Sequence, residues 1–540
     1  MYVPVALAMG LHALLSLSDA SVDATSPARV RVISQQQYVN TIAYVFGPTV
    51  TVSAHFAPFR RIDGLLANGA SVAGVTSGQM QEFQRTAESL ANQVVSPEYR
   101  NFLIPCEPAR DDAADKACAA QFVGSVGRLL HRRPLDPAVQ ARFVGEAGQA
   151  ATELKDFYKG LAVALEGMLV SPDMLFIVDR TEPDPERPGL RRLDAFSLAS
   201  RLSFFLWNSA PDDELLKAAE RGELHTADGR SRAVERMLAS TRLETGVRAF
   251  FDDMLAFEEL AILAKDPGIY PAFTGVTIAD SREQSLRTIV DHLIVQDRDY
   301  RDLFTSRETF ISPALGILDG VVAPPGWTHY EMPADSPRAG LLTQVSFLAG
   351  HSHPGRSSPT LRGKALRELL LCQVVPRPPP DVDFSLFEDP ASSLPTARER
   401  LNAHQANPIC AGCHKVTDPI GLALENFDGA GQHRDTERGA HIDATGSLDG
   451  KSFTDAAGLG AVLRDHPALS ACLVKRLYSY GIGGSPGKAG EKVMLPHLGE
   501  RFAENGYRVP DLMRTVALST AFSAIDAPAA VQAVSAGGGE

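Results

Sequence analysis

The chain is poor in cysteine and in positive charge. Six cysteines in 540 residues are too few for a small disulfide scaffold, although they allow bridges in a large protein. The formal charge of −13 argues against a nucleic-acid partner, which would require a basic face. Zinc-peptidase chemistry has no support either, since no H-E-x-x-H sequence is present. Strand-type alternation is scarce, and no repeat of fixed period is found.

Long apolar runs are missing after the first 20 residues. Residues 2–17 are apolar and of signal-peptide length, and Ser18-Asp19-Ala20 offers small residues for cleavage. Because no Lys or Arg precedes this run, a buried first helix is the alternative. No later stretch has the length that a bilayer needs, so we expect no transmembrane segment in the mature chain.

The cysteines divide into three pairs. Cys106 and Cys118 flank a polar loop and are expected to form a bridge. Cys372 and Cys472 either pair across about 100 residues or remain buried free thiols. The third pair, Cys410 and Cys413, belongs to the motif described below.

Apolar residues at helical spacing dominate the chain and predict a mostly α, multidomain protein. Asp194 is the expected N-cap of one helix, and Thr396 with Glu399 forms a capping box for another that reaches His404. Pro467 suits a first helical turn. The expected helices cover residues 81–95, 118–131, 159–170, 281–293, 361–372, 467–480 and 511–522.

Cys410-Ala411-Gly412-Cys413-His414 is a C-x-x-C-H sequence, the attachment signature of c-type haem. In such a site two thiols bind the haem vinyl groups, and the adjacent imidazole is an axial ligand of iron. We therefore predict a single covalent haem c in a C-terminal cytochrome c-like module. A zinc site and a local disulfide or redox dithiol are the alternatives. Asp418-Pro419-Ile420-Gly421, just after the motif, predicts a tight turn.

Several stretches together resemble the planctomycete-type cytochrome-like proteins, which consist of consecutive domains of unknown function numbered 1587, 1595, 1592, 1588 and 1585. The similar segments are RVISQQQYVNTIAYVFG, CAAQFVGSVGRLLHRRPLDP, LDAFSLASRLSFFLWNSAPDDELL, SSPTLRGKALRELLLC with NPICAGCHKVTDPIGLALENFDGAGQHR, and residues 472–522. With this resemblance the expected domains are a signal peptide (1–20), the five modules (28–100, 101–180, 189–320, 335–435, 440–525) and a disordered tail (526–540).

The resemblance implies an exported protein, periplasmic or on the cell surface, with c-type haem potential. His414 is the proximal ligand, and His404, where the family also carries a His, is the candidate distal ligand. Met494 is a weaker distal candidate, and His351 and His353 are others. Phe427 is expected to pack on the porphyrin, and Arg434 to bind a propionate. Rival propionate partners are Arg362 and Lys364.

The predicted role is electron transfer or haem-dependent oxidation, with a redox partner protein or a small-molecule substrate. No catalytic residue can be named. The alternatives are a surface or assembly protein with a structural C-x-x-C disulfide, and a haem peroxidase with an open iron site.

Overall fold

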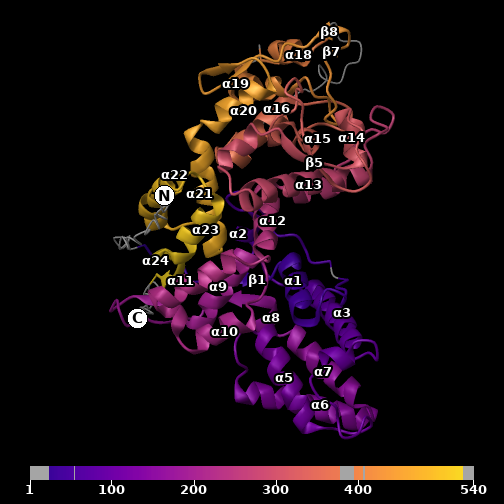
Figure 1. The fold of residues 1–540 in the computed structure, drawn as a ribbon, viewed down its shortest axis with the longest axis vertical. Helices are drawn as coiled ribbons and strands as arrows, with labels where there is room; N and C mark the ends of the chain where they lie inside the picture. Colours follow the sequence, from indigo (N-terminus) through magenta and orange to yellow (C-terminus); the bar gives the residue numbers. More distant parts are fainter. Residues whose placement is uncertain (1–23, 54, 377–393, 406–407, 527–540) are drawn as a thin grey trace, which may run out of the picture.

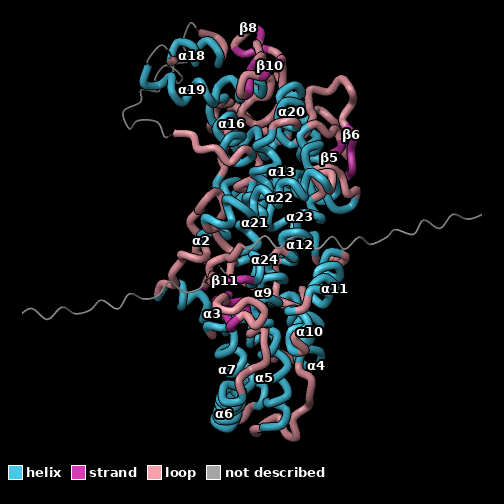
Figure 2. Tube along the Cα trace, turned by 90° about the vertical axis from the view of Figure 1, so that its left-hand side faces the viewer, coloured by secondary structure: helices cyan, strands magenta, loops and turns pink. Residues whose placement is uncertain are grey.

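The computed structural model describes residues 24–53, 55–376, 394–405 and 408–526. It is an elongated stack of helices with short antiparallel sheets, in which the N-terminal helices form one end and the haem-motif region the other (Figures 1 and 2). The mostly helical prediction is confirmed. The expected signal peptide and most of the tail and of the proline run after Cys372 lie outside the described residues. Among those that are described, no helix is both long and apolar enough to cross a bilayer.

The lower end in Figure 1 is a helical bundle with its own core. Phe122, Phe143 and Phe157 lie fully buried at its centre. The predicted bridge between Cys106 and Cys118 is confirmed and ties α5 to the loop before it. The elements of this first part of the chain are β1 (Val30–Val32), α1 (Gln35–Phe46), α2 (Leu66–Gly69), α3 (Ser77–Val94), α4 (Arg100–Leu103), α5 (Lys116–Leu130), α6 (Pro137–Leu154), α7 (Phe157–Leu169), α8 (Pro172–Leu175) and β2 (Phe176–Val178). Of these, β1 and α2 lie in the middle of the molecule (Figure 1).

The middle of the molecule is built around α9, which is buried over most of its length. Its sequence is apolar almost all round, so it requires neighbours on every side. Asp194 caps it by accepting from the Ser197 N–H at 2.7 Å, as predicted. The elements from residues 181–290 are β3 (Thr181–Pro183), β4 (Arg191–Leu193), α9 (Ala195–Trp207), α10 (Asp213–Glu220), α11 (Ala227–Leu238), α12 (Leu243–Met254) and α13 (Gly275–Val290).

The C-terminal helices return to this middle block, so that segments far apart in sequence share one core (Figure 1). They are α21 (Pro467–Ile482), α22 (Leu495–Glu504), α23 (Val509–Leu518) and α24 (Thr520–Ser523), followed by β11 (Ala524–Ile525). Strand β11 pairs with β4, and the buried Arg201 of α9 donates to the Phe522 carbonyl and to Asp179. Arg201 therefore joins α9 both to the segment after β2 and to the C-terminal helix α24.

The upper end carries the haem motif. Cys372 is bonded to Cys472 of α21, so the bridging alternative is confirmed and the free-thiol alternative is wrong. The elements are β5 (Glu308–Ile311), α14 (Pro313–Asp319), β6 (Thr328–Glu331), α15 (Val345–Gly350), α16 (Pro359–Ala365), α18 (Ala397–His404), α19 (Pro408–Gly421), β7 (Thr436–Glu437), β8 (Ala440–His441), β9 (Gly446–Leu448), β10 (Lys451–Phe453) and α20 (Ala456–Arg464).

Two sequence predictions change in detail. The helix expected over 361–372 is α16 followed by a π-helical turn, Leu366–Leu370. The tight turn expected at 418–421 is wrong, because these residues form the last turn of α19. Pro419 lies inside this helix, where it cannot donate a backbone hydrogen bond to the carbonyl four residues back. The capping box of Thr396 and Glu399 is present at α18, as predicted.

Candidate functional site

The haem motif lies in the first turns of α19. Helical spacing places position 410 one turn before Cys413 and His414, so the three positions share one face of the helix. The side chains of residues 406–410 lie outside the described part of the structure. Of the three, Cys413 and His414 can therefore be followed in detail.

His414 is held by a buried carboxylate. Its Nδ1 lies 2.8 Å from Oδ2 of Asp418, four residues later on α19. The side chain of Asp418 is only 1% exposed, against 15% for His414. When Nδ1 carries the proton and donates a hydrogen bond to the carboxylate, Nε2 keeps its lone pair. The same hydrogen bond restrains rotation of the ring. This is how a protein prepares a histidine to ligate a metal.

Asp418 is fixed from three elements. Thr360 of α16 donates to Oδ1 at 2.8 Å, and Gln405 after α18 donates to Oδ2 at 2.9 Å. Thr417 adds a longer contact of 3.2 Å to Oδ1. A buried carboxylate requires such partners, because burial removes the water that would otherwise solvate it. The orientation of His414 thus depends on how α16, α18 and α19 pack.

Two glycines set the closeness of α16 and α19. A Cβ on Gly363 would lie 1.9 Å from the Thr417 carbonyl oxygen, and one on Gly421 would lie 1.8 Å from the Pro359 oxygen. Both neighbours are backbone atoms, which cannot rotate away. Only glycine at these positions allows the helix contact that brings Thr360 to Asp418.

Cys413 is a free cysteine of intermediate exposure. Its thiol donates to the Pro376 carbonyl oxygen at 3.4 Å. Cys413 thus forms no disulfide with a described residue, and the alternative of a disulfide within the motif stays a prediction because the side chain of Cys410 is not described. The zinc alternative gains no support. Within the described ranges, the donors that converge closely enough for a metal are Asp291, Glu308 and His329, none of which belongs to the motif.

His404, the candidate distal ligand, does lie beside the proximal one. The two rings have centroids 4.9 Å apart and meet edge to face at 75°. A metal ion bound by two imidazoles lies about 2 Å from one nitrogen of each ring and close to the plane of each ring. Two rings that meet edge to face at this separation leave no room for such an ion. The proximity is therefore established, and the distal role stays a prediction that requires His404 to move.

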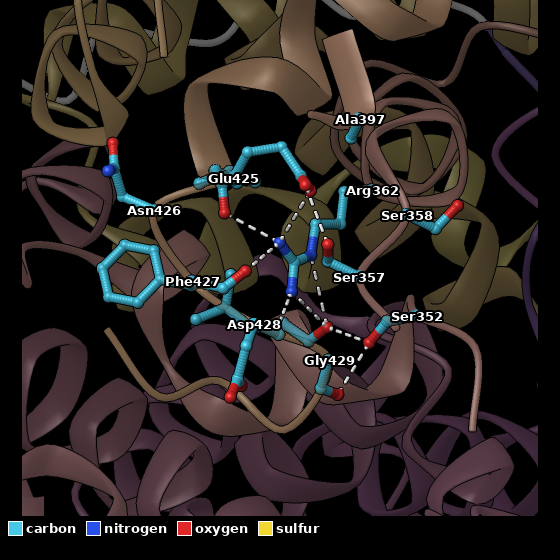
Figure 3. Close-up of polar contacts among 12 residues, drawn as sticks. Ser352, Ser357, Ser358, Arg362, Ala397, Glu425, Asn426, Phe427, Asp428 and Gly429 are labelled. Carbon is cyan, nitrogen blue, oxygen red and sulfur yellow. Dashed lines mark hydrogen bonds and ion pairs between the residues drawn. The ribbon is translucent and has the colours of Figure 1, made fainter. Parts of the chain in front are cut away.

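Arg362 is not a free propionate partner, which corrects the sequence expectation. It is fully buried, and Figure 3 shows its guanidinium enclosed by the chain that follows α19. Burial lowers its pKa to about 10 and raises the pKa of its ion-pair partner Glu425. The donors are satisfied by the backbone oxygens of Leu348, Leu424, Phe427 and Asp428.

Arg434 and Phe427 belong to the same buried cluster. Arg434 donates to Glu425 Oε2 at 3.1 Å and to Ser357 at 2.8 Å, so its charge is already paired. The Phe427 ring is fully buried and lies against His433 and beneath the guanidinium of Arg338. Their described contacts are structural, and a role toward haem stays a prediction for both.

The remaining candidates are placed elsewhere. Met494 is 1% exposed and directly precedes α22, which lies in the middle block and apart from α19 (Figures 1 and 2). His351 packs against Phe347, and burial lowers the pKa of His351 and of His353 to about 4. Both imidazoles are therefore neutral near pH 7. Lys364 lies near Glu368 on the following turn.

A cavity of about 560 Å³ opens beside Asp418. It is lined largely by polar side chains, among them Arg398, Gln405, Thr445 and Ser452. Pro419, Leu422 and Phe453 add apolar surface, so the cavity is mixed in character.

Sequence reasoning missed Asp418, Thr360 and Gln405. The signal for Asp418 was present, because the carboxylate follows His414 by four residues and so shares its face on a helix. Because Pro419 and Gly421 predict a turn, the sequence did not indicate that Asp418 lies on the same helix as His414. Thr360 and Gln405 could not be found in this way, since only the packing of separate helices brings them to Asp418.

Comparison with known proteins supports the family resemblance. Models of four families match, each described as a protein of unknown function: domain 1595 over residues 118–179, 1592 over 193–321, 1588 over 338–437 and 1585 over 449–522. The module expected at 28–100 lies outside these ranges. No curated protein and no solved structure matches the chain. With four domains in the expected order over well over half of its length, the chain belongs to the planctomycete-type cytochrome-like multidomain family.

Proposed function

We propose that this protein is an exported c-type haem protein that transfers electrons or oxidises a substrate. In this proposal Cys410 and Cys413 carry one covalent haem, and His414 ligates its iron. The observation that carries the proposal is the pairing of His414 with the buried Asp418 on the helix that holds the whole motif. Haem bound there would supply one-electron chemistry.

The residues present fit this group. The free thiol of Cys413 is available for a thioether bond, and the three motif positions share a face of α19. Asp418 holds the Nδ1 proton of His414 and so leaves Nε2 as the ligand atom. Since a carboxylate makes the imidazole a stronger electron donor, Asp418 favours the oxidised state of a bound iron.

Export is supported by the two disulfides, which form in oxidising compartments such as the periplasm. The same compartment is where we expect the haem to be attached. Cell fractionation and the mass of the mature chain test both points, because signal cleavage lowers the mass and haem attachment raises it.

The test is the pyridine haemochrome spectrum of protein produced in a host that assembles c-type cytochromes. Wild type is expected to show the spectrum of covalent haem c. A Cys410→Ala, Cys413→Ala double variant should lose it, while Gly412→Ala should keep it. Colourless, unmodified wild-type protein with both disulfides intact refutes the proposal.

A haem-dependent peroxidase is the second candidate, because His404 does not lie in line with His414 as a sixth ligand would. Carbon monoxide distinguishes the two. Rapid binding of carbon monoxide to the reduced protein indicates an open iron site. Slow or absent binding in wild type, together with rapid binding in His404→Ala, indicates that His404 is the distal ligand. An unchanged spectrum in His404→Ala excludes His404 as a ligand.

A further inference from the structure

A second set of metal-ligating side chains lies apart from the haem motif, where the end of α13 meets the hairpin of β5 and β6. It comprises Asp291, Glu308 and His329, each of which offers one donor atom. The three donor atoms lie within 4.8 Å of one another. Figure 2 shows β5 and β6 on the flank of the upper half, away from α18 and α19. The proposed function makes no use of this place.

The hairpin directs its two ligands to one side. Strands β5 and β6 are antiparallel, with Glu308 opposite Glu331 and Phe310 opposite His329. Because side chains alternate along a strand, these four residues share one face of the hairpin. The alternate residues of β5, on the other face, are buried. Two carboxylates directly opposite each other repel, so the face that carries His329 favours a cation.

Asp291 reaches the same point from the end of α13. It opens a π-helical turn, Asp291–Val295, and such turns are frequent at functional sites. Gln296, which follows the turn, donates from its side-chain amide to both Asp291 and Glu308. Among the described residues no lysine or arginine pairs with Asp291, although its side chain is only 22% exposed. Its negative charge is met by a neutral amide and by His329 at 4.0 Å.

The spacing of the donor atoms suits a metal ion. Nε2 of His329 lies 4.0 Å from Oδ2 of Asp291 and 4.0 Å from Oε2 of Glu308. Three atoms at such separations share a point about 2.3–2.5 Å from each, and small side-chain rotations shorten these distances to the ~2.0–2.2 Å of zinc ligands. Gln296 offers a fourth donor, because rotation about its last bond exchanges the positions of the amide nitrogen and oxygen.

We propose that Asp291, Glu308 and His329 bind one Zn²⁺ ion, which joins the end of α13 to the β5–β6 hairpin. An imidazole nitrogen favours zinc over calcium and magnesium, which prefer oxygen ligands alone. The charges of two carboxylates balance that of the ion. His329 is 47% exposed, so water reaches the ion and completes its coordination. Arg298 opposes binding, because its Nη1 pairs with Oε2 of Glu308 at 2.9 Å.

Isothermal titration calorimetry with zinc chloride tests the proposal on the full, untagged chain. The parent form is the Cys410→Ala, Cys413→Ala double variant, which has neither haem nor the motif thiols. The result is therefore independent of the proposed function. Zn²⁺ should bind this form saturably, and Ca²⁺ and Mg²⁺ should bind at least about tenfold more weakly.

Substitutions in the parent form assign the binding to these residues. His329→Ala and Asp291→Asn should each weaken zinc binding by at least about tenfold, since even residues that only support a ligand typically cost that much. Arg298→Ala should strengthen it, because the cation that competes for Glu308 is removed. A residue of purely structural importance would not give this opposite effect.

His441→Ala is the matched control. His441 is an exposed histidine of β8 that does not belong to the cluster. Its replacement should leave zinc binding unchanged, and circular dichroism reports whether each variant folds. Equal zinc binding by the parent form and by folded His329→Ala overturns the proposal, and so does the lack of saturable zinc binding up to ~1 mM. Tighter binding of Ca²⁺ or Mg²⁺ than of Zn²⁺ overturns the assignment to zinc.

Discussion

Replacing Gly363 by alanine should loosen the haem-motif helix. The added Cβ would lie 1.9 Å from the Thr417 carbonyl oxygen, whereas real Cβ contacts hardly ever fall below 3.0 Å. Helices α16 and α19 must therefore separate by about 1 Å, which takes the 2.8 Å bond from Thr360 to Asp418 beyond hydrogen-bonding range. Overpacking of about 1–3 kcal/mol and one lost hydrogen bond of about 1 kcal/mol together predict a loss of roughly 2–4 kcal/mol.

Hydrogen exchange followed by mass spectrometry measures this loss locally, in peptides that cover residues 411–421. A local opening made easier by 2–4 kcal/mol should speed their exchange by roughly 30- to 800-fold. Gly412→Ala is the matched control on the same helix, because a Cβ there meets nothing within 4 Å. It should leave exchange unchanged or slow it, since alanine favours a helix. If Gly363→Ala exchanges like Gly412→Ala, the reasoning about helix contact is refuted.

Three further predictions concern stability. Replacing both cysteines of the Cys372–Cys472 bridge by serine should lower the free energy of unfolding by about 4–5 kcal/mol, because this bridge closes a long loop. The same change at Cys106–Cys118, which closes a short loop, should lower it by about 3 kcal/mol. Urea unfolding measures both losses, and equal losses would contradict the dependence on loop length. Arg362→Met should cost about 3–5 kcal/mol, because it leaves four buried backbone carbonyls without their donor and leaves Arg434 as the remaining cationic partner of the buried Glu425; adding Glu425→Gln should recover part of that loss, and simple additivity of the two changes would refute the pairing. Burial lowers the pKa of His131 from 6.5 to about 4, so the unfolded chain binds more protons than the folded one between these values; stability should be complete above pH 6.5 and decline as the pH falls toward 4, by at most about 3 kcal/mol from this group. Urea midpoints at pH 7.5 and 5 should therefore differ less in His131→Gln than in wild type, and identical differences would contradict the prediction.

Local signals in the sequence predicted the helices well. The apolar spacing over 81–95, 118–131 and 467–480 is matched by α3, α5 and α21 within a few residues. Caps at Asp194 and Thr396 were also correct, because a cap depends only on residues three or four apart. The turn predicted at 418–421 was wrong, because Pro419 and Gly421 are residues that usually signal a turn and here lie inside α19.

Of the proposed site, the sequence identified His414 and its neighbour His404. It assigned roles to Arg362, Arg434 and Phe427 from residue type alone. The structure shows instead that Arg362 and Arg434 share Glu425, and that Phe427 is enclosed in the core. An arginine that binds a ligand and one that holds backbone carbonyls look the same in a sequence, because burial and partners are decided by distant segments.

The sequence by itself determined the helical character, the haem motif, the first disulfide and the family, since each is written in residues that lie close together or in a recurring order. Only the tertiary structure decided that Asp418 orients His414, that Cys372 meets Cys472, and that two guanidinium nitrogens of Arg31 are buried without a partner among the described residues. These are contacts between residues that packing brings together, and local preference contains no information about which distant groups will meet or which will be left without a partner.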